Sequence, residues 1–188
     1  MSNVRQHHVT AELLKPPYRL RPLLSGDAQA FALAVRESTA TVGRWMSWST
    51  PTYTELQAVQ WFEQCASYRA AGSAHEFGIF NEHGEFVGGA GLNQFNAANS
   101  FCNLGYWVRE SAQGRGAATA ACLALARLAL ERLGQHRVEL VVAVGNEPSR
   151  AVAAKVDALY EGVARNRLQL HGAAVDAHVY CLLPRRAA

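Results

Sequence analysis

The chain has 188 residues, of which 49% are hydrophobic and 18% are charged, so it can bury one well-packed core and is short for two domains. No apolar run has the length of a membrane-spanning helix, and the first residues hold no apolar stretch of signal-peptide length. The formal net charge is +3, and the Lys and Arg residues are dispersed rather than gathered in a basic block. These features exclude a membrane protein and do not indicate a nucleic-acid-binding protein.

The cysteines and histidines show none of the spacings that bind zinc or form redox pairs. The four cysteines stand singly, at Cys65, Cys102, Cys122 and Cys181. Scattered cysteines of this kind are typical of small buried side chains in a reducing compartment. We therefore expect a cytoplasmic protein without a metal centre.

The N-terminal part predicts a tail and then a strand. Residues 1–17 end in two prolines that discourage a helix, so we expect a tail or an edge extension there. Alternating apolar and basic residues over 18–24 predict the first strand of a domain that spans 18–184, and residues 185–188 form a second tail.

Two helices are expected next, over 28–36 and after Pro51, where Thr52 and Glu55 have the spacing of a capping box. The loop between them holds Trp45 and Trp48. Large aromatic side chains bury well both as a hydrophobic plug over a core and in a substrate contact, and the sequence leaves both interpretations open.

Three short apolar runs follow, over 77–80, 86–92 and 101–108, and the turn residues between them predict an antiparallel meander. The second half changes to an Ala- and Leu-rich helix over 117–133 and a β-branched strand over 138–144 that suits burial on both faces. A helix over 148–156 and strands over 159–165 and 175–183 complete the chain. This order predicts an α/β fold, with helices flanking a mixed α+β sheet.

The segment that carries chemistry joins the strand that ends at Val108 to the helix that begins at Ala117. Between them, Gly114 and Gly116 flank Arg115. Glycines let backbone N–H groups approach an anion, and the start of a helix adds unpaired donors and a partial positive charge, so this turn can hold a diphosphate. The Walker and dinucleotide-binding glycine patterns are both absent, which leaves a plain tight turn as the alternative.

The stretch from Gln113 to Ala118 is similar to the (Arg/Gln)-x-x-Gly-x-(Gly/Ala) motif of the GNAT N-acetyltransferase superfamily. Further motifs around it resemble the RimJ/RimL branch, which acetylates the N-termini of ribosomal proteins: Leu104 to Val108, Ala118-Thr119-Ala120, Asn146 to Ala151, and Glu161 to Asn166. The likeness runs from about Tyr18 to Leu183. It implies the GNAT fold, a central and mostly antiparallel mixed sheet flanked by helices, and acetyl-CoA as the acetyl donor.

The resemblance also implies a cofactor site, in which the backbone of a splayed strand pairs with the pantetheine arm and the amides of the turn hold the diphosphate. Thr119 would add a hydroxyl, or serve as an ordinary first-turn residue, and Asn146 would contact the pantetheine or cap a helix. The residues expected to bind the cofactor are Tyr106, Trp107, Val108, Gln113, Gly114, Arg115, Gly116, Ala117, Ala118, Thr119, Asn146 and Ser149.

For catalysis, the resemblance assigns Ser149 as the general acid, because Ala153 stands where many family members carry a tyrosine. Glu76 is our candidate for the group that accepts the proton of the amine, provided that Phe77 and Ile79 point into the core. Its alternative is a solvated carboxylate at the end of a strand.

The expected acceptor is a small-molecule amine or the N-terminal amine of a peptide or protein. Substrate contacts are expected from Trp45, Trp48, Asn93 and Gln94, with Phe95 nearby. The chain departs from the branch at Asp157-Ala158, where Gly-Phe is usual.

Two other functions stay open at this point. One is a non-catalytic module that senses coenzyme A, and the other is a basic protein associated with ribosomal RNA. The apolar helical face and the C-terminal strands could support a homodimer.

Overall fold

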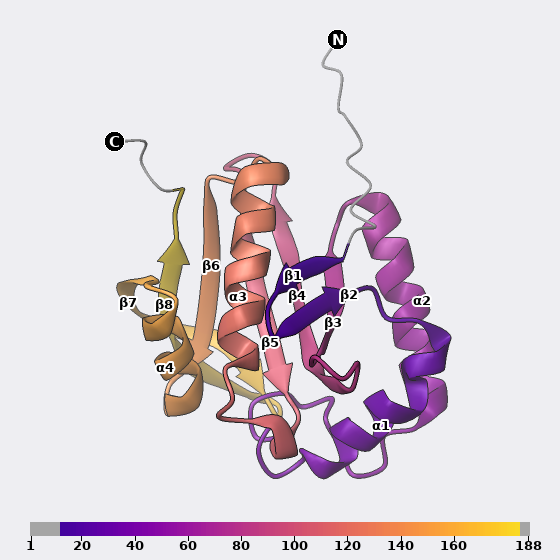
Figure 1. The fold of residues 1–188 in the computed structure, drawn as a ribbon. Helices are drawn as coiled ribbons and strands as arrows, with labels where there is room; N and C mark the ends of the chain where they lie inside the picture. Colours follow the sequence, from indigo (N-terminus) through magenta and orange to yellow (C-terminus); the bar gives the residue numbers. More distant parts are fainter. Residues whose placement is uncertain (1–11, 185–188) are drawn as a thin grey trace.

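The computed structural model describes residues 12–184. Residues 1–11 of the tail or edge extension expected over 1–17, and the expected tail over 185–188, therefore lie outside the described residues. Within the described residues, eight strands form one sheet in the order β1-β2-β3-β4-β5-β6-β8-β7, with helices on both faces (Figure 1). The strands are β1 (Leu13–Lys15), β2 (Tyr18–Arg21), β3 (His75–Phe80), β4 (Phe86–Asn96), β5 (Phe101–Val108), β6 (Arg137–Ala143), β7 (Leu159–Leu170) and β8 (Ala173–Leu182). The α-helices are α1 (Ala28–Glu37), α2 (Glu55–Ala71), α3 (Ala117–Arg127) and α4 (Glu147–Lys155).

The sheet opens between β5 and β6, the one parallel pair among the described strands. Their pairing begins at Phe101 with Arg137 and ends at Asn103 with Glu139. Beyond this point β6 continues alongside β8 as far as Ala143, while β5 continues alongside β4. The backbone edge of the last residues of β5 therefore faces a gap rather than a neighbouring strand, as expected for the splayed strand.

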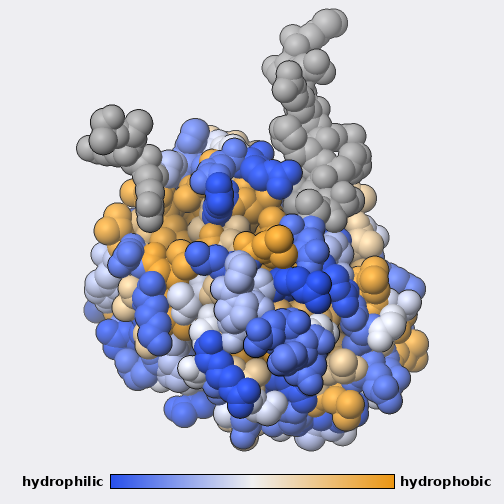
Figure 2. Space-filling view, viewed as in Figure 1, coloured by the Kyte–Doolittle hydropathy of each residue, from blue (hydrophilic) through white to orange (hydrophobic). Residues whose placement is uncertain are grey.

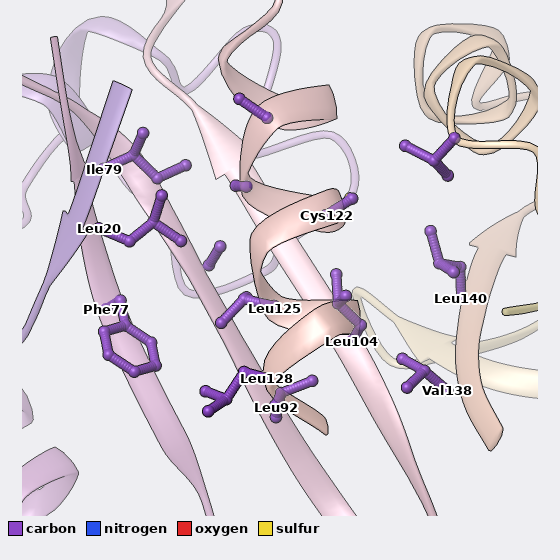
Figure 3. Packing of buried hydrophobic residues seen from close by; sticks show 14 of the residues in the cluster. Leu20, Phe77, Ile79, Leu92, Leu104, Cys122, Leu125, Leu128, Val138 and Leu140 are labelled. Carbon is purple, nitrogen blue, oxygen red and sulfur yellow. The ribbon is translucent and has the colours of Figure 1, made fainter. Parts of the chain in front are cut away.

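Hydrophobic side chains form a core on each face of the sheet. The larger core lies between the sheet and α3, where Leu125 and Leu128 lie among side chains of the strands, Phe77 and Leu92 among them (Figure 3). The second core lies under α1 and α2 and contains Trp107. Successive residues of a strand point to opposite faces, so β3 to β5 supply side chains to both cores.

The sequence predicted the helices and strands in the right places, but several of their ends were predicted wrongly. The first strand stops at Arg21, because Pro22 cannot donate to the ladder, and residues 25–27 form a 3-10 turn. The capping box of α2 uses Thr54 and Gln57 in place of Thr52 and Glu55: Thr54 Oγ1 accepts from the Gln57 amide at 3.2 Å, and Gln57 Oε1 accepts from the Thr54 amide at 2.9 Å.

Two other details differ from the expectation. The predicted helix over 117–133 is α-helical only to Arg127 and continues as a π-helical turn, Leu128–Arg132. Strand β6 is not buried on both faces, because its residues alternate between buried and partly exposed. The β1 strand pairs with β2 at the edge of the sheet, so residues 13–15 form the edge extension. The domain limits of 18 and 184 themselves stay a prediction.

No helix within residues 12–184 is long and apolar enough to cross a bilayer. On the face that carries α3, hydrophilic residues are interspersed with hydrophobic patches (Figure 2). All four cysteines are buried free thiols.

Candidate active site

Two cavities adjoin at the open end of β5. One, of about 530 Å³, lies along the glycine turn and the starts of α3 and α4, and we call it the cofactor groove. The other, of about 390 Å³, lies under α1 and α2, and we call it the acceptor cavity. Met46, Tyr106 and Trp107 line both. A group bound in one cavity can therefore reach a group bound in the other across the end of one strand.

The glycine turn has the backbone shape that an anion site needs. Gly114 and Gly116 have φ values of 76° and 90°, a left-handed region that side chains rarely adopt. A Cβ built on either would meet no atom within 4 Å, so the turn faces open space. The N–H groups that begin α3 point along the helix toward this space, because the first turn of a helix has no acceptors of its own. The residues present thus fit a bound diphosphate.

Most of the expected cofactor residues line the groove, but two do not. Arg115 turns its carbonyl oxygen to the Tyr18 hydroxyl, which donates to it at 2.8 Å, and its side chain is not part of the lining. Asn146 caps α4, where its Oδ1 accepts from the Ser149 amide at 3.2 Å. The lining includes the other ten: Tyr106, Trp107, Val108, Gln113, Gly114, Gly116, Ala117, Ala118, Thr119 and Ser149.

The segment before the glycine turn is clamped to the end of α1. Glu37 accepts from Arg109 Nε at 2.9 Å and also pairs with Arg109 Nη2. The same carboxylate accepts from the Ser111 hydroxyl at 2.8 Å and from the Ser111 amide at 3.2 Å. These bonds, that from Arg109 first, hold the pKa of Glu37 at about 2. On the strand side, Gln113 Nε2 donates to the Val108 carbonyl at 3.0 Å.

Ser149 lines the cofactor groove and does not stand alone there. Its Oγ lies 2.7 Å from the Tyr106 hydroxyl, which reaches across the gap from β5 to α4. Burial raises the pKa of Tyr106, so this phenol stays protonated at any physiological pH. Two hydroxyl groups are thus hydrogen-bonded to each other beside the groove.

Glu76 lies inside the acceptor cavity, opposite Gly91 on the neighbouring strand. A Cβ on Gly91 would lie 1.8 Å from Glu76 Oε2, so this glycine provides the space that the carboxylate occupies. Phe77 and Ile79 belong to the opposite core, as the prediction for Glu76 required. The carboxylate is therefore inside the cavity rather than at a solvated strand end.

A short chain of amides orients Glu76. Asn103 Nδ2 donates to Asn93 Oδ1 at 2.9 Å, and Asn93 Nδ2 donates to Glu76 Oε1 at 3.2 Å. The guanidinium of Arg69, on α2, donates to the backbone carbonyl of Glu76. Burial raises the pKa of Glu76, and the hydrogen bond from Asn93 and the charge of Arg69 oppose that rise. The result is a carboxylate with a pKa above the ordinary range, which makes it a better proton acceptor.

The expected substrate residues separate into three groups. Trp48 and Asn93 line the acceptor cavity, and Trp45 lines the cofactor groove, where its ring passes close to Gly145. Gln94 is exposed and lines neither cavity. Phe95 packs edge-on against His75 at 5.7 Å between centroids, outside both linings. Any role of Gln94 in substrate binding stays a prediction.

The two cavities carry opposite charges. Among the described residues that line the cofactor groove, the charged ones are Arg44 and Lys155, both positive. In the acceptor cavity, Glu76 is the one charged residue among the described residues of the lining. The described residues hold no group of three or more His, Cys, Asp or Glu side chains arranged to bind a metal ion. The groove thus suits an anion and the cavity suits a cation.

The departure at Asp157-Ala158 leaves the end of α4 intact. Asp157 has φ 56°, the left-handed conformation that a glycine usually takes there, and Asp tolerates it better than most residues. Neither residue lines the groove or the acceptor cavity.

Sequence reasoning missed four contributors: the Tyr106 hydroxyl, Asn103, Gly91 and the Glu37 clamp. Gly91 and Asn103 act across neighbouring strands, and the Tyr106 hydroxyl acts from strand β5 to helix α4. No local sequence motif pairs these residues with their partners. One signal was present in the sequence: Asn93 and Asn103 are polar residues within strands that are otherwise rich in apolar residues.

The Acetyltransferase (GNAT) domain family matches residues 18–158, which is most of the chain. Among curated proteins, "Putative ribosomal N-acetyltransferase YdaF" of Bacillus subtilis (strain 168) is 32% identical over 183 residues, covering 95% of this chain and 92% of that protein. The ribosomal-protein-serine acetyltransferase of Escherichia coli (strain K12) is 30% identical over 109 residues, covering 58% of this chain and 60% of that protein.

Solved structures agree on the fold. RimJ of Mycobacterium smegmatis, in complex with CoA-disulfide, is 27% identical with a TM-score of 0.82, and the match covers 93% of this chain and 86% of that one. RimL, a ribosomal L7/L12 acetyltransferase in complex with coenzyme A, has a TM-score of 0.83 at 22% identity, covering 92% and 98%. The chain belongs to the GNAT acetyltransferase family, whose enzymes transfer the acetyl group of acetyl-CoA to an amine.

Proposed function

We propose that this protein acetylates the N-terminal amine of a peptide or protein, by direct attack of that amine on the thioester of acetyl-CoA. The observation that carries the proposal is the meeting of a positive groove and a negative cavity at Tyr106 and Trp107. The groove would hold the polyanionic donor and the cavity the cationic acceptor, so that binding alone would bring the two reactants together.

In the groove, the amides from Gly114 to Thr119 would hold the diphosphate, as the open turn and the helix start allow. Arg44 and Lys155 would add positive charge at the lining. The unpaired backbone edge of β5 at Tyr106 to Val108 would accept the pantetheine arm as an added strand, because β6 has diverged there. The thioester would then lie near the Tyr106 and Ser149 hydroxyls.

Glu76 would take the proton that the amine loses when the new C–N bond forms. A terminal α-amine has an ordinary pKa of about 8, against about 10.4 for a lysine side chain. The α-amine therefore gives up its proton to a carboxylate more readily than a lysine does. Asn93 and Asn103 keep the carboxylate turned into the cavity. Bound coenzyme A supplies the leaving group, a thiolate sulfur that gains a proton as the C–S bond breaks.

Ser149 would donate that proton, and Tyr106 would replace it on Ser149. The 2.7 Å hydrogen bond between the two hydroxyls gives the proton a direct path. Tyr106 thereby has the chemical group of the tyrosine that Ala153 does not provide, and reaches the groove from the strand instead of the helix. The proton accepted by Glu76 and the one given by Tyr106 balance through solvent after product release.

The named relatives support a peptide or protein acceptor, since they are described as acting on ribosomal proteins. The same relatives support a cytoplasmic location. A homodimer stays a prediction, for which the exposed apolar residues of β7, such as Leu159 and Val163, would be the first place to look.

The experiment is acetylation of short peptides that carry one free α-amine and one internal lysine, with the site of modification read by tandem mass spectrometry. We expect acetylation on the α-amine and none on a matched peptide with a blocked N-terminus. Modification confined to lysine would contradict the proposal. So would binding of coenzyme A with no transfer to any peptide, which would indicate a sensor module instead.

A further inference from the structure

The acceptor cavity has apolar walls that a small polar N-terminal residue would not contact. Its lining is dominated by large apolar and aromatic side chains: Leu23, Phe31, Met46, Trp48, Tyr53, Trp61 and Trp107. We propose that the cavity selects acceptors whose amine is followed at once by a large apolar group, an aromatic one above all. This inference rests on the proposed function, because it names the acceptor class of that same site.

Charge restricts the acceptor first. Within residues 12–184, Glu76 is the one charged group that lines the acceptor cavity. A positive amine therefore finds a partner there, whereas a carboxylate or phosphate beside that amine does not. An anion in this cavity would lose its water and face a like charge across a short distance. Acceptors that begin with Asp or Glu are therefore excluded.

Size restricts it next. A cavity of about 390 Å³ is within the range of small-molecule sites, far more than the hydroxymethyl of serine or the methyl of alanine would fill. With serine or alanine as the first residue, the aromatic walls of the cavity would stay in contact with water, whereas a benzyl or indole group would cover them. Each added methylene in an apolar pocket changes specificity by about tenfold or more.

The walls are fixed before any acceptor arrives. Trp107 lies edge-on to Phe31 at 5.4 Å and to Trp48 at 5.5 Å between centroids. Its indole lies over Gly89, where a Cβ would come within 2.6 Å of Nε1. Because these rings are already held in place by their neighbours, they lose little conformational entropy when an acceptor binds. This favours an acceptor whose apolar group is flat and rigid.

The direct test is kcat/KM for peptides that differ only in their first residue, with Phe, Leu, Ala, Ser and Asp compared at fixed acetyl-CoA. We expect Phe to exceed Ser by about 100-fold, Leu to lie between them, and Asp to be the poorest. Equal values for Phe, Ala and Ser would overturn the inference and leave the proposed function standing.

Two variants test the wall itself. Trp48 is 42% exposed, so Trp48→Ala removes one side of the cavity without opening the core, and we expect the Phe-to-Ser ratio to fall about tenfold. Gly105→Val narrows the cavity, because a Cβ at Gly105 meets nothing within 4 Å, and should lower the same ratio. Tyr68→Ala, an equally exposed aromatic on α2 outside the cavity, is the matched control. An unchanged ratio in both cavity variants would contradict the inference.

A binding readout separates this inference from the proposed function. Three of the four tryptophans of the chain line the acceptor cavity, so intrinsic fluorescence reports its occupancy. In the presence of coenzyme A, we expect phenylalaninamide to give a saturable change at concentrations at least tenfold below serinamide. A saturable change with phenylalaninamide but no acetyl transfer to it would show that the cavity selects this class of ligand, and would refute the proposed function. No saturable change with phenylalaninamide would refute the acceptor class.

Discussion

The cofactor groove and the acceptor cavity adjoin at one strand end, yet they are built in different ways. The groove takes most of its chemistry from backbone groups of the contiguous segment from Tyr106 to Thr119. The cavity takes its chemistry from side chains that α1, α2, the loop between them and three strands bring together. A backbone site depends on turn geometry and tolerates many side chains, whereas a side-chain site changes with each substitution. The donor is therefore set by the fold and the acceptor by individual residues.

Removal of the Glu76 carboxylate should have the largest effect on the acceptor cavity and leave the cofactor groove unchanged. Glu76→Gln keeps the size of the side chain and takes away the proton acceptor, so we expect kcat/KM to fall by at least about 100-fold. Affinity for coenzyme A, measured by calorimetry, should stay at the parent value. Glu82→Gln, on the exposed turn after β3, is the control. Parent turnover in Glu76→Gln would show that another group accepts the proton.

The hydroxyl pair tests the junction of the two sites. Tyr106→Phe and Ser149→Ala should each lower kcat by about tenfold or more, and the double variant should be little worse than either, because both interrupt one path. The same cycle on the free energy of unfolding reports the 2.7 Å hydrogen bond without reference to activity. Losses in kcat that multiply in the double variant would mean that the two hydroxyls act separately.

The glycine turn tests the claim that the groove depends on backbone shape. Gly116 has φ 90°, so Gly116→Ala would strain or move the turn at a cost of about 1 to 2 kcal/mol. We expect the dissociation constant of coenzyme A to rise about tenfold while the Phe-to-Ser acceptor ratio stays unchanged. Gly26→Ala, at a glycine with open space and no positive φ, is the control. A changed acceptor ratio with unchanged coenzyme A affinity would contradict the division of roles.

The smallest effect is expected from the clamp on the segment before the turn. Glu37 has a pKa of about 2 because Arg109 and Ser111 bond to its ionised form. A lowered carboxyl pKa stabilises the fold above its ordinary value of 4.5, and this contribution is lost as pH falls toward 2. Since the pair is partly exposed and screened, Glu37→Gln should cost about 1 kcal/mol at pH 7.

Thermal unfolding of the parent and of Glu37→Gln between pH 7 and pH 3 measures this contribution. The difference between the two should shrink steadily below pH 4.5. A difference that does not depend on pH would mean that packing, and not charge, holds the clamp.

The same contrast explains what the sequence could predict. The glycine turn and the helix start lie within one short segment whose residue spacing is itself the signal. The divergence of the strand before the turn was expected from the resemblance to the GNAT family. Glu76 could be proposed from its place before Phe77 and Ile79, but its partner Gly91 and the relay through Asn103 depend on strand register. The Tyr106 hydroxyl was missed because its partner is 43 residues away on α4. Gln94 was expected to orient the substrate because it stands near the end of the glycine-rich strand, and Phe95 was expected to line the acceptor site. Gln94 instead has φ 51° at an irregular point of β4, and both residues lie outside the lining.

The central claim is that donor and acceptor meet at the end of β5 from opposite cavities. A crystal structure of the protein with coenzyme A and an unreactive analogue of the acceptor, such as 3-phenyllactamide, in which a hydroxyl replaces the α-amine of phenylalaninamide, tests it most directly. We predict the diphosphate against the amides from Gly114 to Thr119, the sulfur beside Ser149 and Tyr106, and the analogue among the tryptophans with its hydroxyl toward Glu76. Coenzyme A bound elsewhere, or both molecules on the same side of β5, would contradict the account.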